Sequence, residues 1–345
     1  MMRLPNFRYQ APATVAEAAA ILSDSGPEAR LLAGGTDLLP NMKRRQQTPG
    51  VLIGLRNVKD LHRENGSGSI LRLGAGLTLA HLVESPRIRR QTTGLWQAAA
   101  QIATPQLRNM GTMGGNLCLD TRCAYYDQNE EWRRAIQFCM KKDGQTCWVA
   151  PRSRICLAIS STDTAPALIS LGARVRLVSV RGERELPLED LYRNDGMDYM
   201  TRQPDEILTE VILDTTPGWR STYWKLRRRG SFDFPVLSVA AAVLMDGGGV
   251  AEKIRIVLGA VAMRPLLATA AAALLKGKKL TDDLLEQAAA SAAILAKPMD
   301  NTDFTLHWRK EMARRMVVYA LRELRGDDVL ELRRRLTRQA LLPVA

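Results

Sequence analysis

The sequence predicts an α+β protein with two N-terminal α/β modules and a C-terminal three-stranded sheet with helices. A chain of 345 residues is too long for one small core and suits two or three modules. Short strands and helices alternate through its first part, whereas strands follow one another after Thr215–Gly218 and helices follow Pro265. We therefore expect modules at 1–55, 56–216 and 217–325, with a tail at 326–345.

Composition is that of an ordinary soluble protein, with 46% hydrophobic and 25% charged residues. The 49 basic and 36 acidic residues give a net charge of +13, and short basic runs such as Lys43–Arg45 and Arg227–Arg229 contribute to it. Such runs suit either an acidic or phosphate-bearing partner or simply solvated surfaces, and both explanations stay open. Nucleic acid is not an expected partner because no recognition motif accompanies the charge.

The chain start lacks the apolar region of a signal peptide, and no apolar run approaches the roughly 18 residues of a membrane span. The sequence therefore predicts a cytoplasmic protein that does not bind a membrane. Thiols stay reduced in that compartment, so five cysteines indicate metal or redox chemistry before disulfides.

The first module is predicted to begin with a helix over 14–24, in which Thr14 and Glu17 form a capping box. Strands are expected at 29–33 and 51–55. The first strand leads into Gly34–Leu39, where two glycines, a hydroxyl and a carboxylate suit a diphosphate held by backbone N–H groups. Taken alone, this pattern is explained better by a strand-to-helix turn without a ligand.

The second module is predicted to contain a strand at 69–75, helices at 77–82, 94–102 and 165–171, a hairpin over 174–187 and a strand at 206–213. A second glycine site lies at Arg108–Asn116, where three glycines in nine residues exclude a regular helix. A backbone with so few side chains usually passes close to another group. A tight crossover between modules is the alternative.

All five cysteines lie between residues 118 and 156. A helix is predicted over 127–142, with Trp132, Ile136 and Cys139 on one inward face. The spacing contains no C-x-x-C pair, which disfavours structural zinc, and wide loops between thiolates are compatible with a [4Fe–4S] cluster. Free cysteines remain a further alternative, and the spacing does not indicate which cysteine is spare.

The last module is predicted as a meander of strands at 223–226, 237–245 and 253–258, followed by helices at 268–275, 282–296 and 305–324. The tail is expected to be a basic amphipathic helix or a frayed end. No catalytic residues are expected in this chain, because its three histidines lie in unrelated contexts and no serine lies in a nucleophile elbow.

Four segments together resemble the FAD-binding subunit of molybdenum hydroxylases: Leu31–Leu38, Thr104–Asn109, Gly111–Asn116 and Asp163–Leu168. The resemblance extends from about residue 3 to about residue 325. It implies that modules 1–55 and 56–216 bind FAD, with folds of the p-cresol methylhydroxylase/vanillyl-alcohol oxidase type. It also implies that 217–325 is the C-terminal domain of that flavoprotein family.

The resemblance implies these flavin contacts position by position. The first phosphate-binding loop would be formed by Leu31, Leu32, Ala33, Gly34, Gly35, Thr36, Asp37 and Leu38, and the second by Thr112, Met113, Gly114, Gly115 and Asn116. Ile102 would pack near the flavin, and the Asp163 carboxylate would bond its polar groups. Leu208 and Lys225 would lie near the ring.

About 40 residues more than most family members have lie between the Gly–Gly–Asn turn and Asp163, within a [4Fe–4S] insertion that we expect at about 118–158. This departure, and the string Asn116–Cys123, resemble the beta subunit of 4-hydroxybenzoyl-CoA reductases. That resemblance implies a [4Fe–4S] cluster bound by Cys123, Cys139, Cys147 and Cys156, with Cys118 spare.

The resemblance further implies an electron-transfer subunit beside a molybdopterin-binding large subunit and a small subunit with two [2Fe–2S] clusters, in a dimer of heterotrimers. Ferredoxin would donate electrons for reductive dehydroxylation of the substrate to benzoyl-CoA. Two alternatives remain. One is the FAD subunit of another aromatic or heteroaromatic molybdenum hydroxylase or dehydrogenase, and the other is a zinc-stabilised binding module without redox chemistry.

Overall fold

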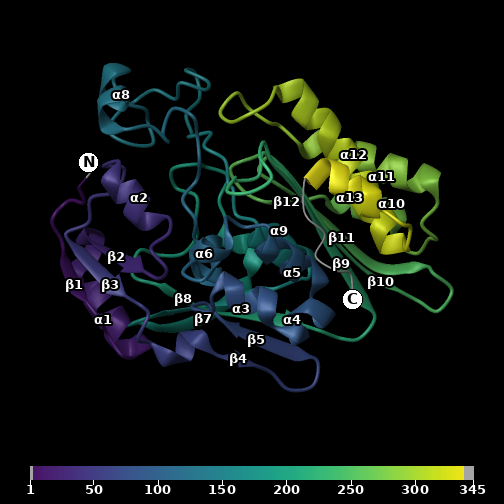
Figure 1. The fold of residues 1–345 in the computed structure, drawn as a ribbon, viewed down its shortest axis with the longest axis horizontal. Coiled ribbons are helices and arrows are strands. Elements are labelled where there is room, and N and C mark those ends of the chain that lie inside the picture. The colour runs from purple at the N-terminus through teal and green to yellow at the C-terminus, as the bar shows by residue number, and fades with distance from the viewer. Residues whose placement is uncertain (1–2, 338–345) are drawn as a thin grey trace.

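The structure, a computed structural model, describes residues 3–337 and contains three sheets that follow one another along the chain (Figure 1). The N-terminal sheet lies at the left of this view, and the C-terminal sheet with its helices lies at the right. This mixed architecture confirms the predicted α+β class. None of the helices within residues 3–337 has the length and apolar composition of a membrane span.

The N-terminal sheet is parallel, with the strand order β1-β3-β2. As predicted, helix α1 begins after Thr14, whose side-chain oxygen accepts a hydrogen bond from the Glu17 N–H at 3.1 Å. It ends at Gly26, whose φ is +54°. The elements of this part are β1 (Arg8–Gln10), α1 (Val15–Ser25), η1 (Gly26–Glu28), β2 (Ala29–Leu32), α2 (Leu38–Lys43) and β3 (Val51–Gly54).

The middle sheet has five strands in the order β4-β5-β8-β6-β7, and every neighbouring pair is antiparallel. The predicted hairpin is confirmed as the β6–β7 pair. The strands are β4 (Glu64–Asn65), β5 (Ile70–Gly74), β6 (Arg174–Ser179), β7 (Gly182–Pro187) and β8 (Ile207–Asp214).

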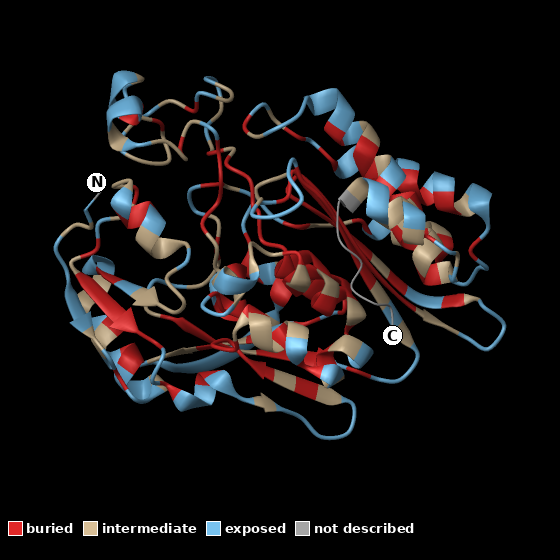
Figure 2. Ribbon diagram, viewed as in Figure 1, coloured by how far each residue is buried: buried red, intermediate tan, exposed pale blue. Residues whose placement is uncertain are grey.

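Helices α5 (Thr93–Ala100) and α9 (Thr164–Ser170) form a buried layer between the middle and C-terminal sheets. Every residue of α9 is buried, and Figure 2 shows the buried residues concentrated in this layer and on the neighbouring strands. The close approach of α5 to β9 favours a glycine, because a Cβ on Gly94 would make a tight contact of 3.2 Å with the Thr222 nitrogen. The other helices here are η2 (Lys59–His62), α3 (Leu79–Glu84), α4 (Pro86–Gln91), α6 (Pro105–Arg108), α7 (Met113–Leu117) and η3 (Leu188–Leu191).

The C-terminal sheet is antiparallel, with the order β12-β11-β10-β9. The predicted three-stranded meander is present, and the two-residue strand β12 adds a fourth. Its elements are β9 (Trp219–Leu226), β10 (Leu237–Met245), β11 (Ala251–Gly259), β12 (Leu266–Leu267), α10 (Thr269–Leu275), α11 (Asp282–Leu295), α12 (Leu306–Arg325) and α13 (Leu330–Thr337). Part of the predicted tail lies outside the described residues.

The helix predicted over 127–142 is wrong, because only Glu130–Ala135 is helical, as α8. Gln137 and Phe138 have φ values of +63° and +61°, which no helix accommodates, and they turn the chain sharply. Cys139 is therefore buried by a loop, and Trp132, expected to face inward, is 39% exposed. The periodic spacing of these side chains reflects no helix face.

The second glycine site contains a short helix, contrary to the expectation that 108–116 excludes one. Helix α7 begins after Thr112 and includes Gly114 and Gly115. Helix α7 packs directly against Ala75, which follows β5. A Cβ on Gly114 would lie 2.7 Å from the Ala75 Cβ, so this packing needs a glycine despite the low helix propensity of that residue.

Candidate functional site: a two-loop cavity beside a cysteine cavity

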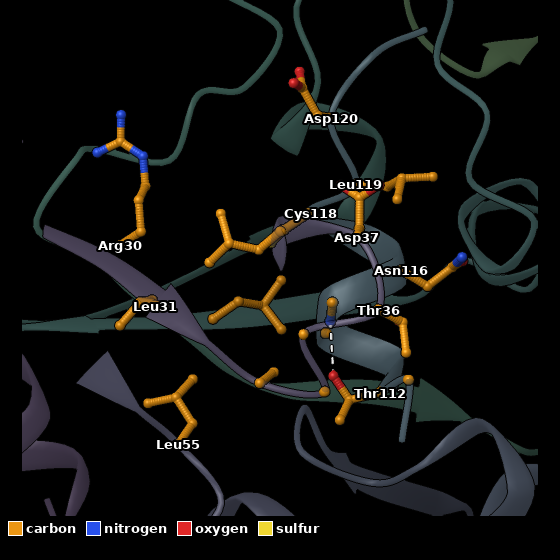
Figure 3. A pocket seen from close by; sticks show the side chains of 18 of the residues that line it. Arg30, Leu31, Thr36, Asp37, Leu55, Thr112, Asn116, Cys118, Leu119 and Asp120 are labelled. Carbon is orange, nitrogen blue, oxygen red and sulfur yellow. Dashed lines mark hydrogen bonds between the residues drawn. The ribbon is translucent and has the colours of Figure 1, made fainter. Parts of the chain in front are cut away.

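A large cavity with a volume of about 1000 Å³ is lined by segments that lie far apart in the sequence. They include the end of β2 with its following loop, the segment from Ile102 to Arg122, and the residues between Met197 and Leu208. Figure 3 shows the β2 loop with Thr36 and Asp37, and α7 with Thr112 and Asn116, around this space. A cavity of this size at a junction between modules suits a large cofactor.

The two predicted glycine sites form one site. A Cβ on Gly34 would lie 1.8 Å from the Met110 carbonyl oxygen and 2.9 Å from the Gly111 Cα, so the two backbones are in direct contact. Gly35 has a φ of +71°, a left-handed conformation that favours glycine. Glycine is therefore required in the first loop both for the turn and for the close approach of the second loop.

Helix α7 is fixed in place by its own cap and by the middle sheet. The Thr112 Oγ1 accepts a hydrogen bond from the Gly115 N–H at 3.0 Å, which is the dashed line in Figure 3. The Gly114 N–H donates to the Ala75 carbonyl at 2.8 Å. Asn116 Oδ1 accepts three hydrogen bonds, from the Thr162 hydroxyl and from the N–H and hydroxyl of Thr164. Asn116 thus ties the second loop to the segment around Asp163.

Asp163 lines the cavity and forms an ion pair with the buried Lys225. Its Oδ1 accepts the Tyr223 hydroxyl at 2.6 Å, and its Oδ2 accepts the Lys225 ammonium at 3.0 Å. Lys225 and Arg227 both donate to the Gln101 carbonyl, at 3.2 and 3.1 Å. Burial raises the pKa of Asp163 and lowers the pKa of Lys225, and each charge opposes the shift of the other. Lys225 is the largest of the interactions that favour the ionised carboxylate against this burial.

Most predicted flavin contacts are brought together around the cavity. Those that line it are Leu31, Ala33, Gly34, Gly35, Thr36, Asp37, Leu38, Ile102, Thr112, Gly114, Gly115, Asn116, Asp163 and Leu208. Leu32, Met113 and Lys225 are not among the lining residues, and Met113 and Lys225 are buried. Lys225 contacts the cavity only through Asp163. The lining also contains residues that the sequence did not single out, such as Tyr199, Arg202 and Phe232.

Sequence patterns also did not identify Arg122 as a site residue, although it immediately precedes Cys123. Its guanidinium forms an ion pair with Asp37 of the first glycine loop and a second one, at 3.1 Å, with Asp127. It lies 4.6 Å from the centre of the Phe234 ring. Arg122 therefore connects the flavin-type loop to the cysteine-rich segment. No local pattern signals this role, because all the residues that define it except Asp127 are distant in sequence.

The four predicted ligands Cys123, Cys139, Cys147 and Cys156 line a second, much smaller cavity together. All four are buried, with Tyr126 and Trp148 in the same wall, whereas Cys118 lines the large cavity instead. Burial raises the pKa of Cys123 to about 12 and that of Cys156 to about 11, so both are neutral thiols at pH 7 unless a cation replaces the proton.

The four thiols thus have the kind and number of donors that an iron–sulfur cluster requires. Within the described part of the chain, no group of three or more His, Cys, Asp or Glu side chains is arranged to hold a metal ion. The four sulfurs surround a common space without forming such a group.

The base of the insertion is closed by backbone and by one asparagine. Arg122 and Ile159 exchange two backbone hydrogen bonds of 2.8 Å. From the C-terminal domain, the Asn301 carbonyl accepts the Ala124 N–H at 2.9 Å, and its Nδ2 donates to the Leu157 carbonyl at 2.6 Å. Asn301 therefore holds both ends of the insertion, next to the first and last of the four cysteines.

Comparisons with known proteins agree with this geometry. A family model described as the FAD binding domain in molybdopterin dehydrogenase matches residues 5–215, and one described as the CO dehydrogenase flavoprotein C-terminal domain matches residues 221–324. The nicotinate dehydrogenase FAD-subunit of Eubacterium barkeri is 30% identical over 82% of this chain and 84% of that protein. The aldehyde oxidoreductase FAD-binding subunit PaoB of Escherichia coli (strain K12) is 34% identical over 75% of this chain and 82% of that protein.

Solved structures show the same fold. Carbon monoxide dehydrogenase from Hydrogenophaga pseudoflava matches with a TM-score of 0.77 and 28% identity, over 94% of this chain and 99% of that chain. The volume of the cavity and the backbone contact between its glycine loops fit a dinucleotide. The chain belongs to the FAD-binding subunits of the molybdenum hydroxylase family, and it is therefore part of an oxidoreductase.

Proposed function

We propose that this chain is the FAD-carrying electron-transfer subunit of a molybdenum hydroxylase or dehydrogenase that acts on an aromatic or heteroaromatic substrate. The observation that carries the proposal is the large cavity with its two touching glycine loops. The name of the nicotinate dehydrogenase relative supports a heteroaromatic substrate.

FAD, when bound, would supply the means to exchange electrons singly or in pairs. The protein would contribute position and electrostatics. Gly34, Gly35 and the loop 112–116 would present backbone N–H groups to the diphosphate. Ile102 and Leu208 would exclude water from the ring, and Asp163, ionised because Lys225 lies 3.0 Å away, would accept hydrogen bonds from its polar edge. Lys225 would act through Asp163 and not on the ring itself.

The substrate chemistry would take place in partner chains. We place the chain beside a molybdopterin-binding large subunit and a small subunit with two [2Fe–2S] clusters, in a cytoplasmic dimer of heterotrimers. Support comes from the names of the relatives, which describe FAD subunits. The modules would be those at 1–55, 56–216 and 217–325, with a tail at 326–345.

The test is to purify the chain with its neighbouring subunits and measure bound flavin and activity. We expect one FAD per chain, and oxidation of a heteroaromatic acid with an artificial electron acceptor. A complex that contains no flavin would contradict the proposal.

A second candidate function is favoured by the four thiols around one cavity. In this version the chain carries a [4Fe–4S] cluster that accepts electrons from ferredoxin, and the complex is a 4-hydroxybenzoyl-CoA reductase. Four buried cysteines around one cavity supply the kind and number of donors of a [4Fe–4S] cluster, and the lack of a C-x-x-C pair disfavours structural zinc.

Metal analysis separates the candidates. Under the second one, we expect about four irons and four sulfides per chain, lost on replacing Cys123, Cys139, Cys147 or Cys156 with serine, while FAD stays bound. Cys118→Ser is the matched control and should keep the iron, because Cys118 lines the other cavity. Zinc, or no metal, would exclude the reductase. Reduction of 4-hydroxybenzoyl-CoA by reduced viologen would support it.

A further inference from the structure

One lysine lies in the wall between the two cavities. Lys141 lines the cysteine cavity, and its ammonium forms an ion pair at 2.8 Å with Asp120, which lines the large cavity. Their side chains are only 6% and 8% exposed. Charged side chains are almost never buried to this extent without a partner. Lys141 and Asp120 thus form one buried pair that extends from one cavity to the other.

The Lys141 ammonium is fixed in place by its neighbours. It donates to Asp120, and also to the Thr121 hydroxyl and the Gly196 carbonyl, both at 2.6 Å. The Gly196 N–H donates in turn to the Cys156 carbonyl at 2.8 Å. A single residue, Gly196, therefore separates the ammonium from the backbone of a proposed cluster ligand.

Two tyrosine rings complete the surroundings of the ammonium. Nζ of Lys141 lies 4.9 Å from the ring centre of Tyr126 and 5.2 Å from that of Tyr199. Tyr126 lines the cysteine cavity and Tyr199 lines the large one. The aromatic rings exclude water and favour a cation at this position. The positive charge is thus stabilised at a defined point in the wall.

Asp120 is held on the other side of the pair. Its Oδ2 accepts the Tyr126 hydroxyl at 3.0 Å and the Gln47 amide at 3.5 Å, and its Oδ1 accepts Lys141. The pair therefore extends from the cysteine cavity, which Lys141 lines, to the large cavity, which Asp120 lines. Charges buried in a protein are screened much less than charges at its surface, so each end acts on the nearer cavity.

We propose that the Lys141–Asp120 pair sets the relative reduction potentials of the two redox groups. This inference rests on the proposed FAD and on the cluster of the second candidate function. An added electron on the thiol-bound group is stabilised by Lys141, and added electrons on the flavin are disfavoured by Asp120. The pair therefore raises the reduction potential of the cluster and lowers that of the flavin. Each electron that leaves the cluster enters the flavin, and a ferredoxin-class protein supplies the electron that replaces it on the cluster.

The experiment measures both midpoint potentials in the purified chain, from flavin absorbance and from the electron paramagnetic resonance of the reduced cluster. Lys141→Gln should lower the cluster potential by at least a tenfold change in its reduction equilibrium, which is 59 mV for one electron. The flavin potential should change less. Asp120→Asn should raise the flavin potential more than the cluster potential. Lys141→Arg keeps the charge and should leave both potentials near those of the wild type.

The opposite signs distinguish an electrostatic role from structural damage, which would not lower one potential and raise the other. Unchanged potentials in variants that retain iron and FAD would overturn the inference and leave both proposed functions intact. If Lys141→Gln loses its iron, the flavin potential of Asp120→Asn tests the inference instead: a raised potential supports it, and an unchanged one overturns it. A wild-type chain with FAD but no iron would overturn the cluster and this inference together, without affecting the FAD proposal.

Discussion

The large cavity and the cysteine-rich insertion are built in opposite ways. The cavity depends on backbone, because its two loops touch where Gly34 meets the Met110 carbonyl and no side chain fits between them. The insertion has one short helix, α8, and is held by single side chains, such as Arg122 at its base and Asn301 from another domain. Backbone contact makes the first region intolerant of any added atom.

The insertion is closed at its base by the backbone pair of Arg122 and Ile159, and the side chains of Arg122 and Asn301 add separate anchors. This difference predicts that changes at the cavity loops act on the whole protein. Changes at the insertion should have smaller and local effects. Four substitutions test the contrast, from the largest expected effect to the smallest.

Gly34→Ala should have the largest effect. The added Cβ would lie 1.8 Å from the Met110 oxygen, so one loop has to move. We expect a loss of more than about 3 kcal/mol of stability, at the upper end for overpacking, together with loss of bound flavin. Flavin absorbance and thermal unfolding measure both. Gly247→Ala is the matched control, since nothing lies within 4 Å of its added Cβ. Normal flavin content in Gly34→Ala would contradict the backbone contact.

Lys225→Met tests a part of the large cavity that depends on side chains. It leaves Asp163 buried without its cation, and breaking a buried ion pair costs about 3–5 kcal/mol. Burial raises the pKa of Asp163, so the folded state keeps the proton to higher pH than the unfolded state, whose ordinary value is 3.8. The loss should therefore be greatest at neutral pH and diminish as the pH falls toward 3.8.

Urea unfolding at several pH values measures this effect. The double variant Lys225→Met with Asp163→Asn removes the unpaired charge and should recover part of the stability at pH 7. A loss that stays the same at every pH would show that packing, and not charge, dominates at this position.

Arg122→Met should cost less, about 2–3 kcal/mol, because it removes charge-assisted hydrogen bonds to Asp37 and Asp127. FAD affinity should also fall, since Asp37 belongs to the first glycine loop. Flavin titration and thermal unfolding provide the measurements. Arg134→Met is the control, because Arg134 forms an exposed pair with Glu130 within α8 and should matter by about 0.5 kcal/mol or less. Equal effects of the two variants would contradict the bridging role.

Asn301→Ala should have the smallest effect, about 1–2 kcal/mol, because only the side-chain bond to Leu157 is lost while the backbone bond to Ala124 remains. The change should be local, so hydrogen exchange near residues 124 and 157 should quicken while that of β8 stays the same. The exposed neighbour Asp300 provides the control variant Asp300→Ala. Faster exchange throughout the middle sheet would show that Asn301 supports more than the insertion.

Local signals predicted the elements, and long-range contacts limited the prediction of the site. The Thr14 cap and the hairpin at 174–187 followed from residues near in sequence, and both are present. The helix at 127–142 failed because Gln137 and Phe138 adopt left-handed conformations that only the tertiary environment enforces. The contact of Gly34 with Met110 joins segments that no local pattern relates.

The same limit applies to residues that act across the fold. The first glycine loop taken alone was explained better by a turn without a ligand, and neither loop indicated that the two share one cavity. Lys141 carries no motif, and its partner Asp120 and neighbour Gly196 lie in separate segments. The family resemblance supplied candidate contacts for the flavin, whereas the residues that connect the two cavities emerge only from the packing.

The paired backbone of Arg122 and Ile159 brings the two ends of the cysteine-rich segment together. Residues that exchange both hydrogen bonds in an antiparallel pair have Cα atoms only about 5.5 Å apart, so the ends of the cysteine-rich segment already meet. A tight turn could join them directly and leave α7 and α9 where they are. The segment therefore leaves and re-enters the rest of the fold at one point, so its length can differ without changing the distance between the chain ends on either side.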